Sequence, residues 1–327
     1  MNQDITYKYF CNKSVSNIAY GCATLANIYK PLNIDDCKQL ITYTFKKGIN
    51  YFDVAPFYGG ELAERNLGYS IKDIPRSELF IATKIGRYTD DNSNSGAGGY
   101  FDFSPSKIEQ SIKKSIDNMN IKYIDLLQCH DIENVSRQTV LDALPLLEHY
   151  KTTGIINGIG INSYPIQPLL DIVESTPIKI NSVGTYAHNT LINNTILDYI
   201  EYFTKKNISI INSSPLAMGL LTQKGPPIWH PASNLMKTTV NNLNNYCLSK
   251  NLNIENLSMI YSLSNKDILT TISGGNSITE IKNNLNCLNK TIDDLIMKDI
   301  TEIVYPIKNK LWGPEEGIIP VYKWIYN

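Results

Sequence analysis

The sequence predicts an α/β fold: a (β/α)8 TIM barrel with long loops on the face that carries active sites in such barrels. Apolar stretches of strand length alternate with longer stretches of helical periodicity, and the alternation repeats about eight times. Several strand candidates are apolar throughout, as expected for strands buried on both faces. Polar side chains stand at the ends of successive candidates, and those ends share one face in this fold.

The strand candidates are apolar stretches of six to eight residues. In chain order they are SNIAYGCA at 16–23, NYFDVA at 50–55, LFIATKIG at 79–86, IDLLQCH at 124–130, IINGIGI at 155–161, INSVGTYA at 180–187, SIINSS at 209–214 and ILTTIS at 268–273. Parallel strands need a crossover between them, and the intervening stretches are long enough for a helix.

The intervening stretches have amphipathic helical patterns. The stretch 104–120 carries an apolar stripe made of Ile108, Ile112, Ile116 and Met119. Ser104 followed by Pro105 suits the start of that helix. The sixth helix shows a similar division in Asp198, Tyr199, Phe203 and Lys206.

Two loops are longer than the repeat requires. Residues 89–99 are polar and glycine-rich and follow the third strand. Residues 214–233 follow the seventh strand, and Pro226 and Pro227 exclude regular structure there. Trp229 offers an aromatic wall and His230 a hydrogen-bonding edge to a substrate, although Trp229 could instead only pack the loop.

Composition narrows the classes of function. With 327 residues, 43% of them hydrophobic, the chain can build one large core, and no linker divides it, so we expect a single barrel domain over 1–327. A net charge of −1 with scattered lysines argues against nucleic acid as a partner. The chain lacks a signal-peptide pattern and any long apolar segment, so we expect a cytoplasmic protein without membrane contact.

The cysteines stand singly along the chain, at positions 11, 22, 37, 129, 247 and 287. Without CxxC spacing or a Cys/His cluster, neither a metal site nor a disulfide framework is expected. Cys129 precedes His130, but neighbouring residues of a strand point to opposite faces. We therefore expect Cys129 to be a packed, inert thiol.

Four polar residues at strand ends form a candidate catalytic set: Asp53, Tyr58, Lys84 and His130. A phenol is a poor base near neutral pH because its ordinary pKa is about 10. A lysine ammonium beside Tyr58 would lower that pKa, and Asp53 would keep Lys84 charged in a dry pocket. His130 would then orient and polarise the reacting oxygen.

Each residue of this set also has an ordinary structural interpretation. A buried Asp–Lys pair is usually structural, and a histidine after a strand is commonly a hydrogen-bonded core residue. The four residues occur in this order and each follows or ends a strand candidate, which favours the catalytic interpretation.

From about residue 15 to 310, the chain resembles the aldo-keto reductase family. The resemblance rests on this catalytic tetrad, on GIGINS and on FDVAPFYGGELAERNLG, ATKIGRY with FDFS, LLQCHDIE and SPLAMGLLTQKGPPIWHPAS. Within the family it is greatest to the enzymes that oxidise L-galactose in the ascorbate pathway. The resemblance implies hydride transfer from C1 of a hexose hemiacetal to a nicotinamide, giving an aldonolactone, with Tyr58 as the base.

The segment after the last strand indicates the type of nicotinamide cofactor. Family members that use NADPH bind the adenosine 2′-phosphate with a lysine and an arginine, and the matching positions here are Gly274 and Glu280. A phosphate would meet a carboxylate and no cation, so NAD is favoured. Glu280 could accept hydrogen bonds from ribose hydroxyls, or it could only stabilise the first turn of its helix.

The resemblance also implies further contacts. Gly274, Gly275, Asn276 and Ser277 would present backbone amides to the cofactor at a helix N-terminus. Asn162 and Ser163 would hold the carboxamide. Other implied cofactor contacts are Thr24, Ser214, Leu216, Gly219 and Asn284. Val183 stands where the family has a glutamine, and Ser213 where it has a stacking aromatic.

A small-molecule sugar is the expected partner, in a monomer or homodimer. The expected substrate contacts are Tyr58, Tyr88, His130, Trp229 and His230. Two alternatives remain open: a dehydrogenase of another sugar, of the L-fucose or D-arabinose type, and a non-catalytic accessory protein resembling potassium-channel β-subunits. Those subunits keep the barrel and the tetrad but favour NADPH and assemble as tetramers.

Overall fold

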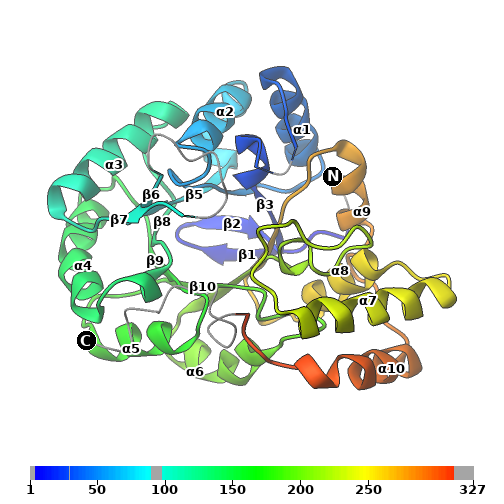
Figure 1. Cartoon of the computed structure of the whole chain (residues 1–327). Helices are drawn as coiled ribbons and strands as arrows, with labels where there is room; N and C mark the ends of the chain where they lie inside the picture. The colour runs from blue at the N-terminus through cyan, green and yellow to red at the C-terminus, as the bar shows by residue number, and fades with distance from the viewer. Residues whose placement is uncertain (1–3, 29, 90–97, 313–327) are drawn as a thin grey trace.

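The computed structural model describes residues 4–28, 30–89 and 98–312. Within them, eight parallel strands close into a barrel that helices surround, which confirms the predicted fold (Figure 1). The barrel strands are β3 (Ile18–Gly21), β4 (Tyr51–Asp53), β5 (Phe80–Ile85), β8 (Leu126–Cys129), β9 (Ile159–Asn162), β10 (Ser182–Tyr186), β11 (Ser209–Ser213) and β12 (Thr270–Ser273). All lie within the expected stretches except β9, which extends one residue further, to Asn162.

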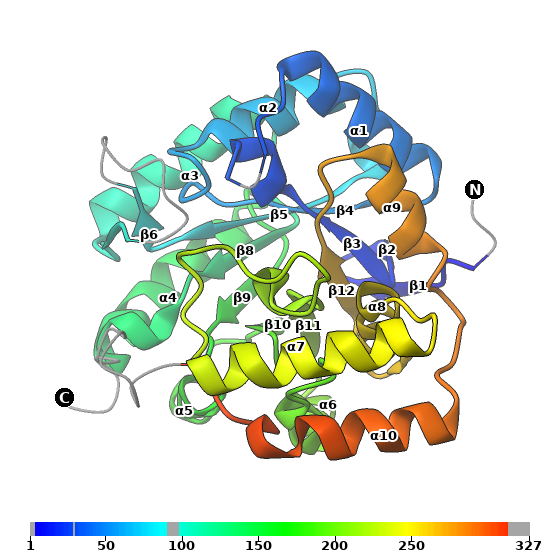
Figure 2. The same cartoon turned by 45° about the vertical axis from the view of Figure 1, so that its right-hand side comes forward.

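The α-helices cover the outside of the barrel (Figures 1 and 2). They are α1 (Ile34–Lys46), α2 (Leu62–Ile71), α3 (Pro105–Met119), α4 (Arg137–Thr152), α5 (Gln167–Ser175), α6 (Ile200–Lys205), α7 (Asn234–Ser249), α8 (Ile254–Ser264), α9 (Ile278–Leu285) and α10 (Asp294–Val304). Helix α3 begins at Pro105, as predicted. The sixth helix is shorter than its pattern suggested, because Asp198 and Tyr199 belong to a preceding 3-10 helix, Thr195–Tyr199.

Side chains alternate between two apolar layers along each strand. The inner layer fills the barrel and includes Tyr51, Phe80, Ala82, Leu126 and Ile211. The outer layer packs the strands against the helices. A step of two residues along a strand keeps the same face, so the inner layer identifies which polar residues point into the barrel near the strand ends.

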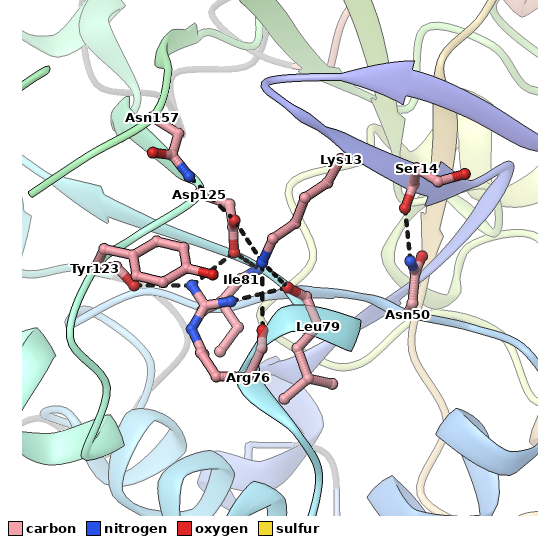
Figure 3. A network of polar contacts seen from close by, with 9 residues as sticks. All are labelled: Lys13, Ser14, Asn50, Arg76, Leu79, Ile81, Tyr123, Asp125 and Asn157. Carbon is pink, nitrogen blue, oxygen red and sulfur yellow. Dashed lines mark hydrogen bonds and ion pairs between the residues drawn. The ribbon is translucent and has the colours of Figure 1, made fainter. Parts of the chain in front are cut away.

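A hairpin of β1 (Tyr7–Phe10) and β2 (Lys13–Ser16) lies across the end of the barrel where the strands begin (Figure 1). Its Phe10 and Val15 belong to the inner apolar layer. Lys13 and Arg76 both pair with the buried Asp125 carboxylate, at 2.9 and 2.6 Å (Figure 3). This polar network fastens the hairpin to the barrel and closes that end.

The opposite end of the barrel, where the strands have their C-terminal ends, is the mouth of the barrel. A short ribbon of β6 (Arg87–Tyr88) and β7 (Tyr100–Phe101) follows β5 there. Residues 90–97 of the predicted polar loop lie outside the described residues. Figure 2 shows α7 and α10 packed side by side next to the barrel.

Candidate active site

Asp53, Lys84 and Gln128 form a buried polar cluster inside the barrel. Each lies two residues after a residue of the inner layer, namely Tyr51, Ala82 and Leu126. Lys84 Nζ donates to Asp53 Oδ1 and, at 2.9 Å, to Val54 O, while Gln128 Nε2 donates to Asp53 Oδ2 at 3.0 Å.

This cluster keeps Lys84 charged. Burial by itself would lower the pKa of Lys84, but the Asp53 carboxylate and the Tyr58 phenol outweigh burial and raise the pKa above its ordinary value. Sequence reasoning missed Gln128, although its place two residues before His130 on one strand could have indicated it.

Tyr58 stands above this cluster at the mouth. Lys84 Nζ lies 5.0 Å from the Tyr58 ring centroid. Burial nevertheless raises the pKa of Tyr58 to about 12, and Lys84 opposes that rise without reversing it. The predicted effect of Lys84 therefore has the right sign, but burial affects Tyr58 more strongly, and its pKa is not lowered overall.

His130 lies beside Tyr58, with the two ring centroids 6.0 Å apart and the rings nearly perpendicular. Burial lowers the pKa of His130 to about 3, so the imidazole is neutral near pH 7. Its buried Nδ1 has no hydrogen-bond partner among the described residues. A neutral imidazole in this position can hydrogen-bond to a reacting oxygen without adding a charge.

A second ion pair lies beside His130 and was not predicted. Arg87 on β6 pairs with the buried Asp131, and its guanidinium carbon lies 3.7 Å from the Phe57 ring centroid. The Asp131 Oδ2 atom lies 3.7 Å from His130 Nε2. The sequence carries both residues next to predicted site residues, but it does not show that the ends of β5 and β8 bring them together.

Asn162 and Gly184 face each other on neighbouring strands at the mouth. A Cβ atom at Gly184 would lie 2.5 Å from Asn162 Oδ1, so only glycine leaves room for the asparagine side chain. Asn162 Oδ1 is buried and has no hydrogen-bond partner within the described part of the chain. Such an oxygen can accept from an amide donor, and the contact that the resemblance implies for Asn162, with a nicotinamide carboxamide, would supply one. Ser163 is fully buried next to it.

Val183, at the position where the family has a glutamine, does not point toward the Asn162 side chain. Val183 packs in the outer apolar layer, whereas alternation along β10 directs Gly184 and Tyr186 inward. Tyr186 is opposite Ser213 in the register and stacks on Tyr164, with ring centroids 4.9 Å apart. The aromatic surface here therefore comes from β10, although the family pattern placed it at position 213.

The loop between β12 and α9 is ordered by its own hydrogen bonds. Ser277 Oγ accepts from Glu280 N at 3.2 Å, and Glu280 Oε2 accepts from Asn276 N at 2.7 Å. These two bonds cap α9, so Glu280 does stabilise the first turn, as its alternative interpretation proposed. Its side chain remains exposed at the helix N-terminus, where a ribose could reach it.

Other residues expected at the cofactor make hydrogen bonds in or next to the same loop between β12 and α9. Asn284 Nδ2 donates to Gly274 O at 3.1 Å, and Thr24 Oγ1 lies 2.7 Å from the Tyr20 hydroxyl. Tyr20 in turn donates to Gly275 O at 2.8 Å. The Tyr20–Gly275 bond thus joins the first barrel strand to the loop that follows the last one.

The loop after β11 contains Ser214, Leu216 and Gly219, and both Ser214 and Gly219 adopt positive φ angles, of 56° and 94°. His230 is buried in this loop: its Nδ1 accepts from Ala232 N at 3.0 Å, so its Nε2 donates to Ala217 O at 2.9 Å. With both nitrogens engaged, His230 supports the loop, and this placement does not support the expected substrate contact.

Besides Tyr58, two aromatic residues are expected at the substrate, Trp229 and Tyr88, and they differ in burial. Trp229 is 36% exposed and stacks beside His230. Tyr88 is buried, and its hydroxyl accepts from Gly86 N at 3.2 Å. Tyr88, a residue of β6, is thus packed inside the protein, whereas Trp229 keeps a surface that a ligand could contact.

The remaining expectations concern the cysteines, metal binding and membrane-spanning helices. All six cysteines are free, and burial raises the pKa of Cys129 to about 12, as expected for an inert thiol. Within the described ranges, no group of three His, Cys, Asp or Glu side chains could hold a metal ion. Of the helices in those ranges, none has the length and apolar character needed to cross a bilayer.

Comparison with known proteins identifies a family. The aldo/keto reductase family model matches residues 17–305. L-galactose dehydrogenase of Arabidopsis thaliana is 34% identical, over 91% of this chain and 93% of that protein. D-arabinose 1-dehydrogenase of Saccharomyces cerevisiae is 29% identical, over 77% and 76%. A solved aldo-keto reductase from Bacillus halodurans in its holo form superposes with a TM-score of 0.77 at 20% identity, over 94% of this chain and 98% of that chain.

Proposed function

Because this chain belongs to the aldo/keto reductase family, we propose that it oxidises an aldose at C1 to the aldonolactone with NAD as the oxidant. The observation that carries the proposal is the buried Asp53–Lys84 pair beneath Tyr58 and His130 at the mouth. In this arrangement, Tyr58 can act as a base and the neutral His130 can hydrogen-bond, both at the same reacting oxygen.

In the proposed reaction, C1 loses a hydride and its hydroxyl group loses a proton. A bound nicotinamide supplies the hydride acceptor. Tyr58 receives the hydroxyl proton, and Lys84 stabilises the phenolate that must exist before this transfer. His130 holds the anomeric oxygen in place, and Asn162 would accept a hydrogen bond from the carboxamide of the bound cofactor. The products are the lactone, the reduced cofactor and one proton that leaves through Tyr58.

L-galactose is the substrate that we favour. The relatives described above include one enzyme named for L-galactose and one named for D-arabinose. These two sugars share the same configuration at C2, C3 and C4, so one pocket could accept both. A D-arabinose or L-fucose dehydrogenase is therefore the second candidate, since L-fucose is 6-deoxy-L-galactose.

The charge near the proposed adenosine site favours NAD over NADP. Glu280 is exposed at the start of α9, where a 2′-phosphate would add a like charge. Lys282, the basic residue of that helix, lies 5.9 Å from the Tyr43 ring centroid on α1. Its ammonium is thus engaged with another helix.

A panel of L- and D-aldoses with NAD and NADP tests this function by the absorbance of the reduced cofactor. We expect the highest kcat/KM for L-galactose with NAD. In Tyr58→Phe, turnover should fall by on the order of 100-fold or more, while NAD affinity stays nearly unchanged. Tight nucleotide binding without oxidation of any aldose would instead favour the accessory-protein alternative.

A further inference from the structure

The carboxylate of Asp131 is fixed at the mouth, directly beside the group that binds the reacting oxygen. Asp131 follows His130 in the chain, is only 4% exposed, and places Oδ2 3.7 Å from His130 Nε2. That separation is too long for a hydrogen bond between the two groups. His130 Nε2 and the second carboxylate oxygen of Asp131 can therefore each bind an oxygen atom of a ligand, and those two oxygen atoms would be neighbours.

Several contacts hold Asp131 in this position. Arg87 Nη1 donates to Asp131 Oδ2, and Arg87 Nη2 donates to Gly98 O at 2.9 Å. The Arg87 guanidinium also stacks over Phe57, the residue before Tyr58. Asp131 itself has a φ of 49°, a left-handed conformation that aspartate and asparagine tolerate better than most residues.

The other carboxylate oxygen is available for a ligand. Asp131 Oδ1 has no hydrogen-bond partner among residues 4–28, 30–89 and 98–312. A carboxylate can accept several hydrogen bonds, and an accepted bond from a hydroxyl group is strengthened by the negative charge. A fixed carboxylate next to His130 is therefore suited to recognise a hydroxyl group next to the reacting carbon.

We propose that Asp131 is a specificity-determining residue that accepts a hydrogen bond from the C2 hydroxyl of the sugar while His130 binds the oxygen on C1. Vicinal oxygens of a sugar lie close enough to reach these two groups together. The substrate class is then a 2-hydroxy aldose, and a 2-deoxy sugar or a simple aldehyde is rejected. This inference rests on the proposed sugar oxidation and adds the position at which the sugar is recognised.

The test compares three sugars in the full-length enzyme with NAD. L-galactose carries both hydroxyl groups of interest, 2-deoxy-L-galactose lacks the one at C2, and L-fucose lacks the one at C6, far from C1. We expect kcat/KM to fall by on the order of 100-fold for 2-deoxy-L-galactose, and by much less for L-fucose, because a buried hydrogen-bonding group is left unpaired only by the former.

The chemistry of the deoxy sugar strengthens this comparison. A hydroxyl group at C2 withdraws electrons and makes hydride loss from C1 harder. Removing it should speed the chemical step, so a slower reaction of the 2-deoxy sugar reflects lost recognition. D-arabinose and 2-deoxy-D-ribose form the same matched pair, and they serve if D-arabinose is the better substrate.

Asp131→Asn removes the charge and keeps a residue type that tolerates the left-handed backbone. We expect this variant to lose on the order of 30-fold in kcat/KM for L-galactose and little for 2-deoxy-L-galactose, so the discrimination collapses. The ratio of L-galactose to L-fucose should stay near the parent value.

Equal losses for L-galactose and 2-deoxy-L-galactose in Asp131→Asn would show that Asp131 only positions His130 and its loop, and would overturn the proposal. A parent enzyme that oxidises the 2-deoxy sugar as well as L-galactose would also overturn it, even if the variant does not fold. Failure to oxidise any aldose would instead contradict the proposed function itself.

Discussion

The ionisation of Tyr58 depends on two opposing effects at one residue. Burial raises its pKa to about 12, and the Lys84 ammonium opposes that rise. Because the base must be deprotonated, the ionised fraction of Tyr58 grows about tenfold per pH unit below its pKa. His130, with a pKa near 3, does not change charge in the neutral and alkaline range. Sugar oxidation should therefore become faster as the pH rises.

Replacing Lys84 by Met tests this balance. Without the ammonium, burial and the nearby Asp53 and Asp131 carboxylates raise the pKa of Tyr58 further, and kcat/KM at pH 7 should fall by on the order of 100-fold. Raising the pH should recover part of the lost rate, in profiles measured from pH 6 to 10. Lys84→Arg keeps the charge and is the matched control. Loss of activity without any alkaline recovery would assign Lys84 to folding through Asp53.

At the scale of single elements, the start of α9 combines helix capping with the choice of cofactor. Glu280→Arg replaces a carboxylate by a cation near the proposed ribose, so the ratio of kcat/KM for NADP to that for NAD should rise by about tenfold or more. Part of this gain should disappear at high salt. Glu280→Gln, which keeps an acceptor for Asn276 N, should give a smaller shift.

The same segment limits how the cofactor preference can be changed. A Cβ atom at Gly274 would lie 2.9 Å from Thr24 Cγ2, so a lysine at position 274 should strain the loop. The single replacement of Glu280 is therefore the cleaner experiment. A parent enzyme that prefers NADP would contradict the role assigned to this element.

The hairpin β1–β2 depends on a buried carboxylate for its attachment (Figure 3). Asp125 is fully buried, pairs with Lys13 and Arg76, and accepts from Ile81 N at 2.8 Å. Asp125→Ala leaves two cations without their partner and should reduce the free energy of unfolding by about 3–5 kcal/mol. Urea unfolding measures this loss.

The effect should be confined to stability, because Asp125 lies near the start of β8 and the catalytic groups lie at the mouth. The kcat/KM of the folded Asp125→Ala protein should stay close to that of the parent. Asp73→Ala removes an exposed ion pair with Lys38 and is the matched control, for which the unfolding midpoint should hardly move. An equal change in both variants would show that the Asp125 network contributes little.

For the whole molecule, a buried acid at the mouth links stability to pH. Burial and the nearby Asp131 carboxylate raise the pKa of Glu133 to about 8. Between the ordinary carboxyl pKa, near 4.3, and about 8, the folded protein holds a proton that the unfolded chain releases. Glu133 therefore makes stability decrease as the pH rises through that window.

Glu133→Gln removes this titration and keeps an oxygen that can accept from Tyr164 N. The melting temperature of the variant minus that of the parent should be larger at pH 8 than at pH 5.5, by about 2 °C or more. Melting curves at several pH values measure the difference. If the two proteins show parallel profiles, Glu133 keeps its ordinary pKa in the folded state.

Alternation and order along the chain were enough to predict the barrel and its central chemical groups. The strand candidates are apolar because both faces of a barrel strand are buried, and Asp53, Lys84 and His130 stand at their ends. These are local properties of the sequence. Motifs in the sequence also carry the resemblance to the aldo-keto reductase family, and the family match over residues 17–305 confirms it.

Only the tertiary structure decided which neighbours each group meets. Gln128 contacts Asp53, Gly184 makes room for Asn162, and Tyr186 is opposite Ser213 because closure and register bring distant strands together. Arg87 meets Asp131 for the same reason, and His230 turns into its loop. Local pattern specifies the elements and the polar residues at their ends, whereas contacts across a closed barrel depend on the packing of the whole chain.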